Sequence, residues 1–156
     1  MHLWDELTVH SSYLITPLVA WLIAGSLKFL INSYRAKRWA FDLIGYGGMP
    51  SNHSSIVWSA VSIIYFTHGS SEPALVVAIA LAFIVMLDAS SLRKQVGKQA
   101  KAINQLNQLA DVSSPPKEPT TLRERIGHSS AELLAGLMVG VFTGWLVHWV
   151  ESSLPF

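Results

Sequence analysis

Long apolar segments separated by short polar loops are the feature that most limits what this chain can fold into. Only 13% of its 156 residues are charged and 51% are hydrophobic, whereas soluble domains have about 25% charged residues. About 20 residues of helix, rising 1.5 Å each, cross the roughly 30 Å hydrocarbon core of a bilayer. The apolar segments cover about residues 13–34, 50–68, 72–90 and 128–150. We therefore expect an all-α fold, a polytopic membrane bundle of about four transmembrane helices that forms a single integral membrane domain over residues 1–156.

Residues 91–110 have a different pattern from the apolar segments. Their apolar positions approximate one helical stripe, formed by Leu92, Val96, Ile103, Leu106 and Leu109. The opposite face carries Arg93, Lys94, Lys98 and Lys101. This pattern predicts an amphipathic helix that lies on the membrane surface. The proline-rich, polar residues 111–121 that follow predict a flexible loop.

The distribution of basic residues predicts the orientation. Every lysine and arginine except Lys28 lies within residues 35–38 or 93–125, in the loops that follow the first and third apolar segments. The positive-inside rule places such loops in the cytoplasm, and a four-span chain indeed has these two loops on one side. We expect an integral protein of a bacterial inner membrane, with both termini outside.

This orientation gathers chemically reactive side chains at the cytoplasmic face. The residues brought there are Lys28, Arg35, His53, Asp88 and His128. His53 and His128 each follow a helix-starting pattern, and free backbone N–H groups at a helix N-terminus favour a phosphate. Glu132 lies one helical turn after His128, where its carboxylate can fix the imidazole tautomer. The pattern predicts a site that acts on an anionic group at the bilayer surface.

Several of these features also have purely structural interpretations. Small residues repeat along two of the predicted helices, at Ser51, Ser55, Ser59 and Ser62 and at Gly136, Gly140 and Gly144, and this spacing is typical of close helix packing. Lys28 can reach the headgroups from its helix end, and Lys98 and Lys101 can simply hold anionic headgroups. His10, His68 and His148 fall near the outer face, as interfacial histidines or as a weakly indicated metal site.

Three sequence motifs resemble the divergent branch of the type 2 phosphatidic acid phosphatase family, which is related to acid phosphatases and vanadium haloperoxidases. They are GGMPSNHSS from residue 47, the run from Asp88 to Leu106, and GHSSAELLAGLMVG from residue 127. The signatures of the wider superfamily are Lys-x6-Arg-Pro, Pro-Ser-Gly-His and Ser-Arg-x5-His-x3-Asp. Lys28 and Arg35 have the first spacing, with Ala36 in place of proline. Pro50, Ser51 and His53 match the second, with Asn52 in place of glycine. His128 and Glu132 match the end of the third, and Leu122 stands where that signature has arginine.

The resemblance implies a mechanism and a set of site residues. His128 would form a phosphohistidine, Glu132 would orient it, and His53 would act as general acid and base. The residues implied to bind phosphate are Lys28, Arg35, Ser51, Asn52 and Arg93, with Asp88, Lys94, Arg123 and Arg125 as further candidates. The scheme requires no metal, and a divalent cation at Asp88 is an alternative role for that carboxylate. Because the superfamily core usually has six helices, the amphipathic segment or a second subunit of a homo-oligomer would complete the site.

The location of the site predicts the substrate class. A lipid phosphate monoester, such as phosphatidic acid or phosphatidylglycerophosphate, or an isoprenoid pyrophosphate already has its tail in the bilayer beside the catalytic groups. The membrane and this lipid are the expected partners, and no nucleic acid is expected. Two other hypotheses are a catalytically degenerate scaffold or regulator that binds anionic lipid, and a lipid-phosphate transporter. Transport is less favoured because the charges lie near one end of the spans and provide no polar path across the bilayer.

Overall fold

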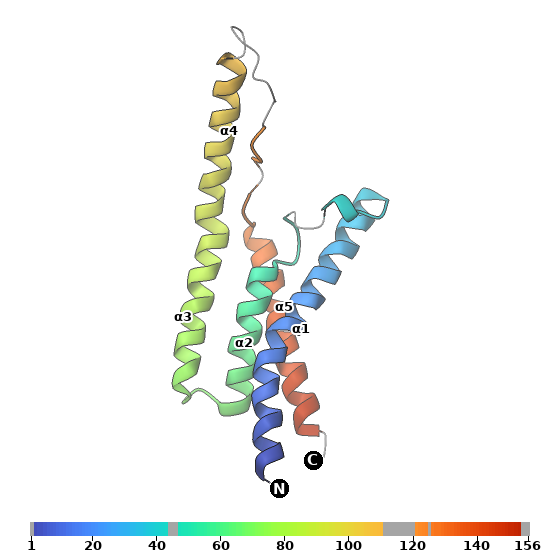
Figure 1. Cartoon of the computed structure of the whole chain (residues 1–156), viewed down its shortest axis with the longest axis vertical. Helices are drawn as coiled ribbons and strands as arrows, with labels where there is room; N and C mark the ends of the chain where they lie inside the picture. Colours follow the sequence, from blue (N-terminus) through green and yellow to red (C-terminus); the bar gives the residue numbers. More distant parts are fainter. Residues whose placement is uncertain (1, 44–46, 111–120, 125, 154–156) are drawn as a thin grey trace.

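The fold is a bundle of α-helices, seen in a computed structural model that describes residues 2–43, 47–110, 121–124 and 126–153 (Figure 1). The elements in chain order are α1 (His2–Ala36), the 3-10 turn η1 (Phe41–Leu43), α2 (Asn52–His68), α3 (Pro73–Leu87), the π-helical turn η2 (Asp88–Leu92), α4 (Arg93–Ala110) and α5 (Ser130–Ser153). The described residues include no strand. The all-α expectation is confirmed, and the predicted loop at residues 111–121 lies outside the described part except for Thr121.

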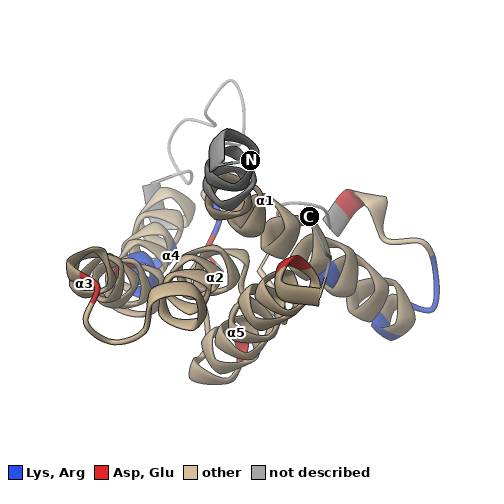
Figure 2. Ribbon diagram, turned by 90° about the horizontal axis from the view of Figure 1, so that it is seen from below, with Lys and Arg blue, Asp and Glu red and all other residues tan. Residues whose placement is uncertain are grey.

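Helix α2 is the centre of the bundle. It contacts α1, α3 and α5, and the end-on view shows it between α3 and α5 (Figure 2). Its buried residues include Ser54, Ser55, Ser59 and Ser62 as well as Val57 and Val61. A core made largely of small side chains lets the helix backbones approach closely, as in other membrane bundles.

The glycines of α5 face the serines of α2, as their spacing predicts. A Cβ atom added at Gly140 would lie 2.5 Å from the carbonyl oxygen of Ser55, and one at Gly144 would lie 2.6 Å from Cβ of Ser62. Hydrogen bonds join the same helices, because Ser54 Oγ donates to the Leu133 carbonyl at 2.8 Å and Ser62 Oγ donates to the Val141 carbonyl at 2.9 Å. The packing role of these small residues is confirmed.

Large apolar side chains point away from the bundle. On α3, Val76 and Val77 are each 69% exposed and Phe83 is 64% exposed, as expected for side chains that face lipid. Within the described residues, three stretches are long and apolar enough to cross a membrane: 12–36, 73–108 and 130–153. The expected count of about four is not confirmed, because α2 has only 17 residues and would span about 26 Å at 1.5 Å per residue.

The third span continues directly into α4. The sequence predicts that residues 91–110 turn aside to lie on the membrane surface, but α3, η2 and α4 follow one nearly straight path (Figure 1). Asp88 and Arg93, at the two ends of η2, both have right-handed helical backbone angles. No proline or glycine interrupts the chain between them, so the amphipathic segment keeps the direction of α3.

Helix α1 opens the bundle at one end. It contains Pro17, which lacks the N–H needed for a helical hydrogen bond and commonly bends a helix. Its buried face repeats every four residues, at Ser12, Thr16, Ala20 and Ala24. Beyond that stretch α1 leans away from α2 and α5 (Figure 1). The divergence leaves room for a pocket beside the N-terminus of α2.

Candidate active site

A pocket of about 860 Å³ lies between α1, the N-terminus of α2, the start of α4 and the segment before α5. Its polar lining consists of Ser26, Lys28, Asn32, Asn52, His53, Arg93, Arg123 and His128. Its apolar lining includes Trp21, Leu22, Phe29, Leu30, Phe41, Ile56 and Ile126. Residues that are up to about a hundred positions apart in sequence thus share one chamber, with basic and imidazole groups beside an apolar wall.

The two predicted histidines face each other across this pocket. The ring centroids of His53 and His128 lie 5.8 Å apart, with the ring planes at 62°. His128 is buried, and its backbone N–H donates to the Ala89 carbonyl in η2 at 2.9 Å. This bond fixes the depth of His128 relative to Asp88 and Arg93. Single π-helical turns of this kind are frequent at functional sites.

Glycine at position 127 permits the approach of His128 to the start of α4. Gly127 has a φ of 99°, and a Cβ atom there would lie 3.1 Å from the backbone nitrogen of Lys94. Any larger residue would be strained in its backbone and would also press on α4. The chain can therefore pass close to α4 and enter α5 immediately after His128.

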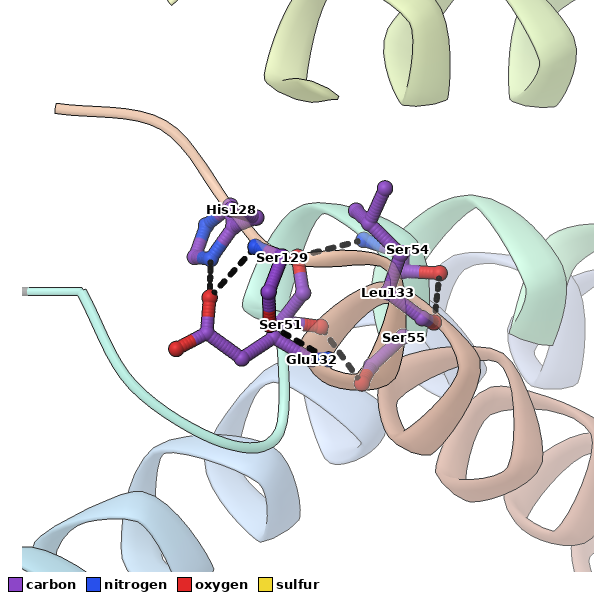
Figure 3. A network of polar contacts seen from close by, with 7 residues as sticks. All are labelled: Ser51, Ser54, Ser55, His128, Ser129, Glu132 and Leu133. Atoms are coloured by element: carbon purple, nitrogen blue, oxygen red, sulfur yellow. Dashed lines mark hydrogen bonds and ion pairs between the residues drawn. The ribbon is translucent and has the colours of Figure 1, made fainter. Parts of the chain in front are cut away.

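Glu132 holds both His128 and the N-terminus of α5 (Figure 3). Its Oε2 atom lies 3.2 Å from Nδ1 of His128 and accepts the backbone N–H of Ser129 at 2.9 Å. In return, Ser129 Oγ accepts the backbone N–H of Glu132 at 3.3 Å. This reciprocal pair is a capping box. The contact with His128 predicted from the sequence is present, and Glu132 also caps the helix.

Two buried polar atoms mark the start of α2. Nδ1 of His53 and Oδ1 of Asn52 have no hydrogen-bond partner within the described part of the chain. Buried polar atoms are usually hydrogen-bonded, so a polar ligand in the pocket is a suitable hydrogen-bond partner for these two atoms.

Three basic side chains line the pocket. They are Lys28 from α1, Arg93 at the start of α4, and Arg123 from the segment before α5. Nε of Arg93 donates to Oδ2 of Asp88 at 3.0 Å, so Asp88 holds Arg93, which is one of the roles predicted for this carboxylate.

Among the described residues no group of three or more histidine or acidic side chains forms a metal site.

Asn104 on α4 fixes the segment that carries Arg123. Its side-chain amide donates to the Leu122 carbonyl at 2.8 Å and to Glu124 Oε1 at 2.9 Å, and its oxygen accepts the Leu122 N–H at 2.9 Å. Gly97, seven residues before Asn104 on the same buried face of α4, lies against the Glu124 backbone. Residues 121–124 therefore run beside α4 (Figure 1). Arg123 lines the pocket from this segment, which α4 holds in place.

Ser51, Arg35 and Lys94 were predicted site residues but do not line the pocket. Ser51 is fully buried, where its Oγ caps α2 by accepting the Ser54 N–H at 3.4 Å, and it does not line the pocket. Arg35 and Lys94 are exposed and do not line it either. Arg125 lies outside the described residues. Motif spacing does not specify the direction in which a side chain points, so the phosphate-binding roles of Ser51, Arg35 and Lys94 stay predictions.

Sequence reasoning missed Asn32, Ser129 and Asn104. Asn32 lies four residues after Lys28, a spacing that places both on one helical face, and Ser129-x-x-Glu132 is a recognisable capping box. These two signals were present in the sequence. Asn104 had no such signal, because its partners are 18 and 20 residues away.

An ion pair braces the segment after α1. Nη1 and Nη2 of Arg38 donate to the two carboxylate oxygens of Asp42 at 2.7 and 2.8 Å. These hydrogen bonds hold the pKa of Asp42 below its ordinary value and raise the pKa of Arg38. The pair is exposed, and it flanks Ala40 and Phe41, which line the pocket.

The predicted outer histidines are at the other end of the bundle. His68 contacts the Tyr13 hydroxyl, and His148 lies 3.5 Å from Thr67 Oγ1. Each thus has a polar side-chain partner, as interfacial residues commonly have.

Comparisons with known proteins identify the family of this chain. Residues 9–143 match the family described as the divergent PAP2 family, where PAP2 denotes type 2 phosphatidic acid phosphatase. The chain is 28% identical over 139 residues to the uncharacterized membrane protein YuiD of Bacillus subtilis (strain 168), and the match covers 82% of this chain and 88% of that protein. No solved structure matches. Because the family match spans most of the chain, including both histidines and Glu132, this integral membrane protein belongs to the divergent PAP2 family.

Proposed function

We propose that this protein is a lipid phosphatase that hydrolyses a lipid phosphate monoester or an isoprenoid pyrophosphate through a phosphohistidine intermediate. The observation that carries the proposal is the pair of imidazoles, His53 and His128, 5.8 Å apart in a pocket that also contains Lys28, Arg93 and Arg123. Membership of the divergent PAP2 family supports the reaction class.

His128 is the proposed nucleophile. Its Nδ1 atom contacts Glu132, so Nε2 is the nitrogen assigned to attack phosphorus. A bond forms between Nε2 and phosphorus while the bond from phosphorus to the leaving oxygen breaks; that oxygen is the lipid oxygen of a monoester or the bridging oxygen of a pyrophosphate. His53 gives a proton to the departing oxygen and becomes neutral. It then accepts a proton from the water that attacks the phosphohistidine, which releases inorganic phosphate and restores His128.

The cations stabilise the charge on the transferred phosphoryl group. Electrostatic stabilisation is usually the largest part of phosphoryl-transfer catalysis. Arg93 is held by Asp88 and Arg123 by the segment bound to Asn104, so both are oriented before substrate arrives. Lys28 contributes a third positive charge from α1. Asn52 is assigned to a phosphate oxygen through its side-chain amide.

The apolar lining favours a substrate with a hydrocarbon tail. Trp21, Leu22, Phe29 and Leu30 of α1 line the same pocket as the histidines, and Trp21 and Leu22 are half exposed. A tail can enter beside α1 from the bilayer while its phosphate rests among the cations. The basic loops put this end of the bundle at the cytoplasmic face.

The capping box supports a second candidate function. Glu132 has a structural role in holding the start of α5, so its presence does not require catalysis. A protein that binds an anionic lipid in the same pocket without turnover, as a scaffold or regulator, accounts for the cations and the apolar wall.

Phosphate release from a panel of lipid phosphates and pyrophosphates, by purified protein with and without EDTA, distinguishes the two functions. An enzyme releases phosphate, His53→Ala reduces turnover by about 10²- to 10⁴-fold, and His128→Ala abolishes it. His148→Ala, at the far end of the bundle, is the matched control and retains turnover. Lipid binding without phosphate release under all conditions identifies the scaffold.

Orientation is tested separately. In intact cells a cysteine at Ser70 should react with a membrane-impermeant thiol reagent, and one at Ser114 should be protected. The reverse labelling would move the site to the outer face.

A further inference from the structure

An apolar stripe along η2 and α4 is not covered by any described part of the chain. Leu92, Val96, Ile103 and Leu106 are 61%, 44%, 44% and 63% exposed. The buried positions of α4 are instead Gly97, Ala100 and Asn104. Gly97 and Asn104 contact residues 122–124. The stripe and the contact with that segment therefore occupy different faces of one helix.

Much of this stripe extends beyond the reach of a bilayer. The continuous helical run from Pro73 to Ala110 is about 57 Å long at 1.5 Å per residue, and the hydrocarbon core is about 30 Å thick. Figure 1 shows α4 continuing past the upper ends of α2 and α5. Lipid that covers α3 does not cover the far part of α4, so Val96, Ile103 and Leu106 need another partner.

The spacing of the stripe identifies that partner as a helix. Leu92, Val96, Gln99, Ile103 and Leu106 are separated by alternating steps of four and three residues, which is the a and d pattern of a coiled coil. Val96 and Ile103 then occupy a positions, and Leu92 and Leu106 occupy d positions. β-Branched residues at a with leucine at d favour a two-stranded parallel coil.

We propose that α4 forms a parallel coiled coil with α4 of a second copy of this chain. Both copies insert α3 with the same orientation, so their α4 helices emerge on one side of the membrane and pair in register. Lys94, Lys98 and Lys101 lie on the opposite face of α4, so their charges point away from the seam. The seam covers only about two heptads, and tethering in one membrane raises the effective concentration of the partner helix.

Cysteine cross-linking tests the seam directly, because the natural chain has no cysteine. Val96→Cys and Ile103→Cys each place equivalent thiols opposite each other in the proposed dimer. Under mild oxidation in native membranes both variants should convert to a covalent dimer. Lys94→Cys and Lys101→Cys, on the outer face, are the controls and should stay monomeric. Equal cross-linking at all four positions, or none at Val96 and Ile103, would overturn the proposal.

Misfolding can also abolish dimer formation, so a variant that strengthens the proposed dimer is tested as well. Gln99→Leu replaces the polar residue in the seam, so the dimer should persist at a higher detergent concentration than the natural chain. Val96→Lys combined with Ile103→Lys should give a monomer of unchanged helix content, measured by light scattering and circular dichroism. If Gln99→Leu has no effect and labels at Val96 and Ile103 are quenched by lipid-attached probes, the stripe binds the bilayer surface and the coiled coil is wrong.

Discussion

Nδ1 of His128 lies 3.2 Å from Oε2 of Glu132, and the same oxygen accepts the backbone N–H of Ser129 at 2.9 Å. One carboxylate oxygen thus joins a candidate nucleophile to the first turn of α5. Holding the imidazole by Nδ1 leaves Nε2 as the reacting nitrogen. The arrangement also means that substitutions of Glu132 affect both helix capping and chemistry, so the two roles must be separated experimentally.

Glu132→Gln and Ser129→Ala separate these roles. The amide oxygen of glutamine can still accept the Ser129 N–H, but the negative charge beside His128 is lost. We expect Glu132→Gln to lower phosphatase turnover while the melting temperature changes little. Ser129→Ala removes the cap and should destabilise the protein by about 1 kcal/mol, with a smaller effect on turnover. If Glu132→Gln has the same turnover as the natural chain, Glu132 acts only as a helix cap.

Arg93 is expected to be the principal phosphate ligand. Its Nε is held by Asp88, which leaves the terminal nitrogens for two phosphate oxygens. Lysine cannot reproduce this two-nitrogen contact. A hydrogen bond to a charged group contributes about 1.5–3 kcal/mol, so Arg93→Lys should lower kcat/KM roughly tenfold or more.

Arg123→Lys and Arg125→Lys should have smaller effects than Arg93→Lys under identical detergent conditions. Arg38→Lys, whose partner Asp42 lies on the exposed loop, is the control and should retain kcat/KM. If Arg123→Lys is the most damaging, the segment before α5 supplies the main clamp, in agreement with the third signature of the superfamily.

Asn104 should act on the site through Arg123. Its three hydrogen bonds to Leu122 and Glu124 fix the segment on either side of that arginine, although Asn104 itself does not line the pocket. We expect Asn104→Ala to raise KM and to make Arg123→Lys less damaging than it is in the natural chain. Residues joined in one network show coupling energies of about 0.5–3 kcal/mol. Asn107→Ala, at an exposed position on the same helix, is the matched control. If the effects of Asn104→Ala and Arg123→Lys on kcat/KM are strictly additive, Asn104 does not act through Arg123.

The helix packing and the proximity of the histidines could be predicted from local patterns. Serine and glycine repeats define the faces by which α2 and α5 meet, and helix-starting patterns place His53 and His128 at the same end. The direction of each helix could not be predicted in this way. The apolar stripe of residues 91–110 predicts an amphipathic helix but does not fix its direction, and α4 continues straight from α3.

Side-chain direction was the second limit of prediction. Ser51 belongs to the matched motif, yet its hydroxyl caps α2, and its backbone carbonyl lies against Gly136 of α5. Arg123 follows the flexible loop predicted at residues 111–121, and its segment is held through Asn104. Both outcomes depend on contacts between residues far apart in sequence, which a motif does not encode.

Gly140 provides a test of the α2–α5 interface. Alanine is favoured over glycine in a helix by about 1 kcal/mol, but a Cβ atom at Gly140 would lie 2.5 Å from the Ser55 carbonyl oxygen and 2.9 Å from the Ser59 nitrogen. These are backbone atoms of α2, so the helices must separate, and overpacking costs about 1–3 kcal/mol. Gly140→Ala should therefore lower the melting temperature in detergent. At Gly25 the nearest atom to an added Cβ is Nδ2 of Asn52 at 3.8 Å, so Gly25→Ala is the matched control and should melt at the same temperature or higher. Equal melting temperatures for the two variants would mean that α2 and α5 are not packed as closely as the structure shows.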